Sequence, residues 1–372
     1  MTSQSVELLF RPLAFGATTL RNRIVMGPMT RRRSPGGVPG ANVAAYYRRR
    51  AAGGVGLVVT EGTYIDHPGA SAYANVPHFF GAESLAGWAD VLAGVHAEGA
   101  AMIPQLWHVG GLRERGMAPD PQVPGYGPCE VAKDGILTVK AMNQADMAEI
   151  AQSYGRGARA ARETGFDGVA VHAAHGYLID QFFWEATNRR QDEYAGSIEN
   201  RCRFAVQVLE TIRHEVGPDF PIVFRFSQWK QNDYEARIAR TPDELGIILR
   251  TLVAAGVDVF DVSARRFWLP AFAGSDLCLA GWTRRLSGKP VIAVGSVGLD
   301  QPHQSKVYRR PDNVDAKVTD IGTVLERMSQ GDFDLVAVAR AILADAQWPE
   351  KIRRGAYDEI TPFTHAAMEA YE

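Results

Sequence analysis

The sequence contains little cysteine. Its 372 residues include only Cys129, Cys202 and Cys278, and no two of them form a CxxC pair. Structural zinc sites and iron–sulfur clusters usually take closely spaced cysteine ligands, so neither kind of site has its local signature here. We therefore expect three unpaired thiols in a reducing compartment and predict a cytoplasmic protein.

Long apolar runs and a strong charge of one sign are also missing. No stretch approaches the length of a membrane span, and the N-terminus lacks a basic segment followed by an apolar run. The formal net charge of -2 gives no electrostatic reason to expect nucleic acid or an anionic membrane as partner. With 46% hydrophobic residues, the chain has the material for a large core. A small molecule is the expected partner, and the sequence leaves homo-oligomer formation open.

The chain does contain a regular alternation of short apolar runs with amphipathic stretches. Strands are predicted at Ile24 to Met29, Leu57 to Thr63, Ala101 to His108, Gly165 to Ala173, Pro221 to Ser227, Val257 to Ala264, Pro290 to Ser296 and Asp334 to Arg340. Helices are predicted at Leu85 to Glu98, Ala145 to Glu163, Ile198 to Val216, Pro242 to Ala255 and Ile321 to Gln330. This pattern predicts an α/β protein, a (β/α)8 TIM barrel with extended active-site loops, in which residues 1–372 form a single domain. An open doubly wound sheet is the alternative, but no GxGxxG follows the first strand.

Two long stretches interrupt the alternation, at Val109 to Met142 and Val297 to Thr319. Both are expected to be irregular. Loops that follow barrel strands carry the active site, so insertions there are typical of lids or pocket walls. A solvated loop explains the second stretch equally well.

The strongest local signal begins at His172, where HAAHGYLIDQFFWEATNRRQDEYAGSIENRCRF follows a predicted strand. His172, His175 and Tyr177 would gather hydrogen-bonding groups at the barrel mouth, although separate packing roles also explain them. A metal site is disfavoured, because no carboxylate or third histidine nearby completes a ligand set.

The run from His172 through Arg203 resembles the diagnostic segment of the old yellow enzyme family. The resemblance implies a flavoprotein oxidoreductase with noncovalent FMN, reduced by NADH or NADPH. It implies that His172 and His175 bind the activating oxygen of the substrate and that Tyr177 donates a proton. The chemistry is consistent, since imidazole donors polarise a conjugated double bond and a phenol with a pKa of about 10 stays protonated at neutral pH.

The resemblance extends along most of the chain. GPMTR implies that Pro28 and Met29 pack against the flavin and that Thr30 approaches its carbonyl edge, while TEGT places Gly62 where the flavin nears the backbone. QLWH assigns Gln105 to the flavin pyrimidine edge and Trp107 to the substrate pocket. Taken alone, each of these positions is also explained by turns or packing.

FRFS places Arg225 beside the flavin, where a fixed cation would stabilise the reduced ring. An internal ion pair is the alternative for this residue. Phe267 and Trp268 are candidate walls of the substrate pocket, with core packing as their alternative.

The paired phosphate loops of the family correspond to AVGSVG, with Gly295 and Ser296, and to AVAR, with Ala339 and Arg340. Barrels often bind phosphate after their seventh and eighth strands. Two features depart from the family: Ala339 replaces a glycine, and the stretch from Val297 to Thr319 is longer than usual.

The resemblance predicts ping-pong reduction of an electron-poor alkene, namely an enone, enal or nitroalkene. Two alternatives stay open, an oxidative N-demethylase of a small amine and a flavin-binding redox sensor without turnover.

Overall fold

Eight parallel strands close into a barrel in the order β10-β11-β12-β13-β3-β4-β5-β9. The computed structural model describes residues 3–113, 115–303 and 315–371. The barrel strands are β3 (Ile24–Met26), β4 (Leu57–Tyr64), β5 (Ala101–Trp107), β9 (Val169–His175), β10 (Ile222–Lys230), β11 (Val259–Ser263), β12 (Val291–Val294) and β13 (Leu335–Val338). Each overlaps a predicted strand, so the predicted TIM barrel is confirmed.

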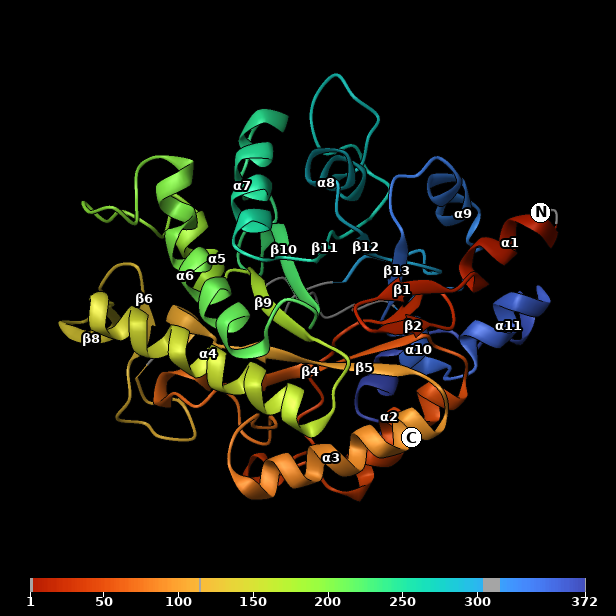
Figure 1. The fold of residues 1–372 in the computed structure, drawn as a ribbon, viewed down its shortest axis with the longest axis horizontal. Helices are drawn as coiled ribbons and strands as arrows, with labels where there is room; N and C mark the ends of the chain where they lie inside the picture. The colour runs from red at the N-terminus through yellow and green to blue at the C-terminus, as the bar shows by residue number, and fades with distance from the viewer. Residues whose placement is uncertain (1–2, 114, 304–314, 372) are drawn as a thin grey trace.

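Helices surround the barrel, as Figure 1 shows for α3, α4, α6, α7, α8 and α9. The helices are α1 (Ser3–Phe10), α2 (Ala41–Ala52), α3 (Ala82–Ala97), α4 (Gln144–Thr164), α5 (Leu178–Phe183), α6 (Ile198–Val216), α7 (Pro242–Ala254), α8 (Leu279–Ser287), α9 (Gly322–Ser329), α10 (Arg340–Ala344) and α11 (Trp348–Arg354). All five predicted helices are present. Within the described ranges, every helix is too short or too polar to cross a bilayer.

Local capping explains where the longest helix begins and ends. The Asn143 side chain accepts from the Asp146 backbone N–H at 2.9 Å, and the Asp146 carboxylate accepts from the Asn143 N–H at 2.9 Å, which forms a capping box at the start of α4. Gly165 ends α4 in the left-handed conformation, with φ +95°. The prediction that a strand begins at Gly165 is therefore wrong at that end, because β9 begins at Val169.

Strand residues alternate between two apolar layers. Residues such as Ile103, Ala170, Val223 and Val259 pack with one another in a small cluster inside the barrel. Their neighbours along each strand face outward into the larger core beneath the helices. The inner layer thus fixes which residues of each strand point into the barrel.

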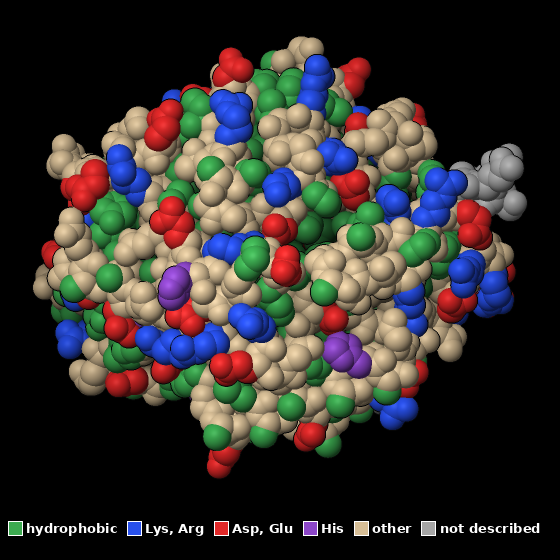
Figure 2. Space-filling model, viewed as in Figure 1, with side chains coloured by type: hydrophobic (Ala, Val, Ile, Leu, Met, Phe, Trp, Pro, Cys, Tyr) green, Lys and Arg blue, Asp and Glu red, His purple; other side chains and the backbone are tan. Residues whose placement is uncertain are grey.

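A hairpin of β1 (Leu13–Phe15) and β2 (Thr18–Leu20) covers one end of the barrel and lies in front of the strands in Figure 1. Its Phe15 and Leu20 belong to the inner cluster. A surface pocket beside the hairpin is lined by residues that precede or begin barrel strands, including Pro221 and Pro290, so it lies at the N-terminal end of the barrel. In Figure 2 this face carries basic and acidic side chains interspersed, in keeping with the small net charge.

The stretch from Val109 to Met142 is more regular than predicted. It contains β6 (Gly125–Gly127), β7 (Val131–Lys133) and β8 (Ile136–Ala141), which form a three-stranded sheet in the order β6-β8-β7. The expectation of irregular structure is wrong there, because short strands pair with each other outside the barrel. Of the second stretch, residues 304–314 lie outside the described residues, and Leu299 pairs with Val318 at its base.

Candidate active site

Several polar side chains point into the barrel on the C-terminal side of its inner apolar layer. They are Gln105 and Trp107 on β5, His172 on β9, Arg225 on β10, and Asp261 and Ser263 on β11. Each lies two or four positions after an apolar residue of the inner cluster, on the C-terminal side. Because side chains alternate along a strand, these groups converge inside the C-terminal mouth of the barrel.

Three predicted site residues form an aromatic group at this mouth. The Tyr177 ring lies 4.9 Å from the Trp107 ring and 4.9 Å from the His172 ring, edge-on to both. The Trp107 and His172 rings are 5.9 Å apart. All three residues are buried, with exposures of 2 to 6%. Trp107, His172 and Tyr177, which are separated in the sequence, therefore lie in contact in the fold.

His175 joins the group by a special backbone conformation. Its φ is +64°, uncommon for a residue with a side chain, and its N–H donates to Ser227 Oγ at 2.9 Å. Its Nε2 lies 2.8 Å from Ser263 Oγ, and its ring packs 4.4 Å from Trp229. The β9–α5 turn thus presents His175 beside His172, with ring centroids 5.3 Å apart.

Burial holds both imidazoles neutral. It lowers the pKa of His172 well below the ordinary value, and the Arg225 charge lowers it further. Burial likewise lowers the pKa of His175, with His172 and Arg225 adding to the effect. A neutral imidazole carries one N–H donor. His175 keeps this donor for an acceptor oxygen in the tautomer in which Ser263 Oγ donates to its Nε2.

Arg225 is held in place by an ion pair with Asp261. Its Nη1 donates to Asp261 Oδ2 at 2.6 Å, and its Nη2 lies 3.5 Å from Ser263 Oγ. Both side chains of the ion pair are nearly inaccessible to solvent, with exposures of 7% and 1%. The internal ion pair that the sequence offered as an alternative is present, and it leaves Arg225 Nε free within the described residues.

Unpaired buried donors mark where the expected flavin fits. Among the described residues, Gln105 Nε2, His172 Nδ1, Trp107 Nε1 and Arg225 Nε are buried without a hydrogen-bond partner. A buried donor without a protein partner is satisfied when a bound ligand offers it an acceptor. An amide and a guanidinium suit the acceptor-rich pyrimidine edge of a flavin, so the residues present fit FMN.

The residues assigned around the flavin ring follow β3 and lie within β4. Pro28 and Met29 are half-buried after β3, and Thr30 is exposed. Gly62 is in register with Gln105 on the next strand. A Cβ added at Gly62 would lie 2.5 Å from Trp107 Cε3. The structure therefore gives a second reason for glycine, since the Trp107 indole packs against it.

The predicted phosphate loops follow β12 and β13. Gly295 has φ +142°, and Ser296 has φ +55° with its Oγ donating to the Arg265 carbonyl at 2.9 Å. Ala339 precedes α10, and Arg340 Nη2 donates to the Gln301 carbonyl at 2.6 Å. Burial lowers the pKa of Arg340 to about 10, which leaves it charged at neutral pH.

Phe267 and Trp268 have contacts in the outer layer of the barrel. The Phe267 ring packs 5.9 Å from Phe333 and 5.2 Å from Trp268. The Trp268 carbonyl accepts from Arg327 of α9 at 3.4 Å. These contacts agree with the core-packing alternative, and a role in the substrate pocket stays a prediction.

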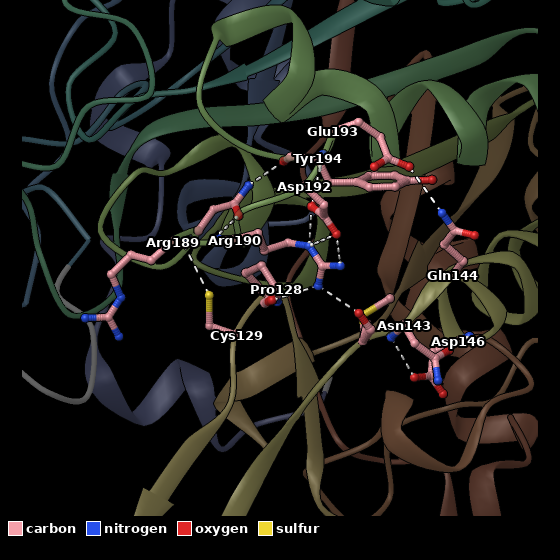
Figure 3. Close-up of polar contacts among 12 residues, drawn as sticks. Pro128, Cys129, Asn143, Gln144, Asp146, Arg189, Arg190, Asp192, Glu193 and Tyr194 are labelled. Carbon is pink, nitrogen blue, oxygen red and sulfur yellow. Dashed lines mark hydrogen bonds and ion pairs between the residues drawn. The ribbon is translucent and has the colours of Figure 1, made fainter.

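Residues in the second half of the diagnostic segment contact the segment that carries β6, β7 and β8, as Figure 3 shows. Arg190 Nη1 donates to the carbonyls of Pro128 at 2.9 Å and Met142 at 2.7 Å, and Arg190 Nε donates to Asp192 at 2.9 Å. The Arg189 N–H donates to Cys129 Sγ at 3.2 Å. These contacts hold the β6–β8 segment against the second half of the diagnostic segment.

Sequence reasoning missed Asp261, Ser263 and Gln231. The strict alternation of β11 from Val259 signals that Asp261 and Ser263 face the interior. Gln231, whose Nε2 donates to Tyr177 Oη at 2.5 Å, follows an irregular part of β10 and has no comparable signal.

Comparison with known proteins identifies the family to which this chain belongs. Residues 8–314 match the NADH:flavin oxidoreductase / NADH oxidase family. The chain is 31% identical over 371 residues to putative 12-oxophytodienoate reductase 13 of Oryza sativa subsp. japonica, covering 98% of this chain and 94% of that protein. It is 32% identical over 365 residues to an NADH oxidase of Thermoanaerobacter brockii, covering 95% of this chain. That match spans about half, 52%, of the length of the NADH oxidase.

A solved structure of morphinone reductase in complex with tetrahydroNAD superposes with a TM-score of 0.80 at 27% identity, covering 97% of this chain and 93% of that one. The match thus extends over the barrel and its excursions, and an NADH analogue is bound in the solved relative. On these grounds the chain belongs to the NADH:flavin oxidoreductase, or old yellow enzyme, family of flavoproteins.

Proposed function

We propose that this chain uses noncovalent FMN and NADH or NADPH to reduce the activated C=C bond of an enone, enal or nitroalkene. Residues 1–372 serve as a single FMN-binding domain in this proposal. The observation that carries it is the Tyr177 ring, edge-on at 4.9 Å to both His172 and Trp107. A proton donor and a hydrogen-bonding imidazole thus share the mouth with the unpaired donors that suit a flavin.

Residues on strands β4, β5 and β10, and in the segments that follow β3, β12 and β13, would hold the cofactor. When bound, FMN would supply the chemistry for hydride transfer between a nicotinamide and the alkene. Gln105 and Arg225 would bind the polar edge of its ring, and Pro28, Met29, Thr30 and Gly62 would line it. Gly295, Ser296, Ala339 and Arg340 would bind its phosphate through backbone N–H groups and a guanidinium.

The remaining residues act on the substrate. His172 and His175 donate hydrogen bonds to the carbonyl or nitro oxygen and draw electron density from the double bond. Tyr177 protonates the α-carbon, and burial raises the pKa of its hydroxyl, so the proton is present at every pH of interest. Trp107, with 2% exposure, limits access of water to this corner of the pocket.

The relatives support the nicotinamide partner. One is named an NADH oxidase, and the morphinone reductase structure holds tetrahydroNAD. Several relatives are named 12-oxophytodienoate reductases, which is in keeping with a conjugated carbonyl substrate.

Purified protein provides the test. It should be yellow, release FMN on denaturation, and oxidise NADH or NADPH when 2-cyclohexenone is added. Parallel assays with N-methyl amines should give no turnover. Amine oxidation without alkene reduction would instead identify an N-demethylase. Fast flavin reduction with no reoxidation by a panel of alkenes would identify a redox sensor.

A further inference from the structure

The hydroxyl of Tyr177 has a partner that the sequence did not indicate. Gln231 Nε2 donates to Tyr177 Oη at 2.5 Å. A phenol oxygen carries one hydrogen and two acceptor positions. With an amide N–H directed at one acceptor position, the hydroxyl hydrogen is turned away from Gln231 and towards other acceptors.

The backbone fixes Gln231 against the segment that carries Tyr177. The Gln231 N–H donates to the His175 carbonyl at 3.3 Å, and Lys230 pairs with His175 in the β10–β9 ladder. Gln231 directly follows Lys230, and Tyr177 lies two residues after His175, so both are close to this pair of residues. The amide is presented by a strand end rather than by a loose loop.

A buried ion pair strengthens the same junction. Lys230 Nζ lies 2.6 Å from Asp180 Oδ1, and neither side chain is exposed. The other carboxylate oxygen of Asp180 accepts from the Gly176 N–H at 2.6 Å. The Asp180 carboxylate therefore joins Gly176, which precedes Tyr177, to Lys230, which precedes Gln231.

The direction of the hydrogen bond matters for proton transfer. Burial raises the pKa of Tyr177, and the amide of Gln231 opposes that rise. When Tyr177 gives up its proton, the bond to the phenolate oxygen becomes charge-assisted and stronger. An interaction that strengthens as charge develops lowers the barrier of the step.

We propose that Gln231 is a positioning residue for the proton donor, orienting the Tyr177 hydroxyl towards the substrate and stabilising its oxygen as the proton leaves. The inference rests on the proposed function. In the step, the Tyr177 O–H bond breaks and its electron pair stays on oxygen. The proton forms the new C–H bond at the α-carbon of the substrate enolate, and solvent then reprotonates Tyr177.

Two substitutions separate this role from packing. Gln231→Leu removes the donor, and Gln231→Glu keeps the size but presents a carboxylate that accepts the hydroxyl hydrogen. In stopped-flow experiments on the FMN-loaded enzyme, both variants should be reduced by NAD(P)H at the wild-type rate. Reoxidation by 2-cyclohexenone should slow about 10- to 100-fold, the scale of a hydrogen bond to a charged group.

The pH profile gives a readout that a structural role would not move. Gln231→Glu should regain reoxidation rate as pH falls, because a protonated carboxyl again donates to Tyr177 Oη, whereas Gln231→Leu should stay slow throughout. Identical pH profiles for the two variants would overturn the proposal.

A double-mutant cycle with Tyr177→Phe assigns the effect to the hydroxyl. Gln231→Leu should add nothing in the Tyr177→Phe background, and an equal further loss there would overturn the inference. If Tyr177→Phe slows reoxidation but Gln231→Leu does not, the inference fails while the proposed function stands. If Tyr177→Phe itself has no effect, the proton donor of the proposed function fails first and this inference falls with it.

Discussion

Arg225 and Asp261 lie on adjacent strands and form a buried ion pair, with Nη1 and Oδ2 2.6 Å apart. The carboxylate fixes the guanidinium in the barrel mouth and offsets part of its charge. The electrostatic effect of Arg225 on a bound flavin therefore depends on Asp261 as well.

Arg225→Ala is expected to weaken FMN retention and make the flavin harder to reduce. The loss of a charged hydrogen-bonded contact corresponds to about 1.5–3 kcal/mol, or about 30–65 mV for a two-electron couple. Asp261→Asn should act in the opposite direction on the potential, because it removes the negative charge that offsets Arg225. Spectroelectrochemical titration measures both shifts, and unchanged potentials in folded, FMN-loaded variants would remove Arg225 from this role.

Tyr177→Phe keeps the ring that packs on Trp107 and His172 but removes the hydroxyl. Flavin reduction by NAD(P)H should remain fast, while reoxidation by 2-cyclohexenone should slow by around 10²–10⁴-fold, the usual contribution of a general acid. Nitroalkenes serve as the control, since a stabilised nitronate can be protonated later in solution. Enone reoxidation at the wild-type rate would show that Tyr177 is not the donor.

Replacing both His172 and His175 with alanine is expected to weaken binding of phenols and enones while FMN stays bound. Two hydrogen bonds of about 0.5–1.5 kcal/mol each predict a loss of roughly 5- to 150-fold in affinity. Spectral titration of the FMN-loaded variant with a phenol measures it. Retained phenol affinity would place the acceptor oxygen elsewhere.

Gly62→Ala tests the contact between β4 and the pocket aromatic. The new Cβ would meet Trp107 Cε3 at 2.5 Å, so the indole must shift, at a cost typically of about 1–3 kcal/mol. We expect a lower melting temperature and a raised KM for alkene. Gly94→Ala in α3 is the matched control, because its nearest contact would be an ordinary 3.6 Å and alanine favours the helix. Equal melting temperatures for the two variants would contradict the argument.

A histidine pair beside the mouth predicts acid sensitivity. His108 Nε2 lies 3.0 Å from His67 Nδ1, and burial lowers the pKa of His67 to about 4 and that of His108 well below its ordinary value. The unfolded chain binds these protons near pH 6.5, so the stabilisation is full above that pH and is lost as pH falls towards 4. Urea unfolding at a series of pH values should show the decline.

The control for that decline is His67→Gln, which keeps an acceptor for His108 but does not titrate. It should unfold with a shallower dependence on pH than the wild type between pH 6.5 and 4. A parallel dependence would show that His67 contributes nothing to acid sensitivity.

The sequence by itself indicated the barrel and several members of its mouth. Each predicted strand is short, apolar and followed by a helix pattern, which indicates a parallel sheet buried on both faces. A closed barrel was preferred to an open doubly wound sheet because no GxGxxG follows the first strand. His172 was identifiable from its place at the end of a predicted strand, and Gln105 and Arg225 from the family resemblance. Trp107 and Tyr177 followed from the family resemblance and lie in contact with His172.

Only the tertiary structure decided which polar groups pair within that mouth. Between Phe226 and Lys230, β10 advances four residues while β9 advances two, from Ala173 to His175. Such a shift breaks the alternation, and no local pattern places Gln231 on Tyr177 after it. Arg225 and Asp261 are 36 residues apart, and their contact depends on strand register, which packing of the whole barrel sets and a single strand does not encode.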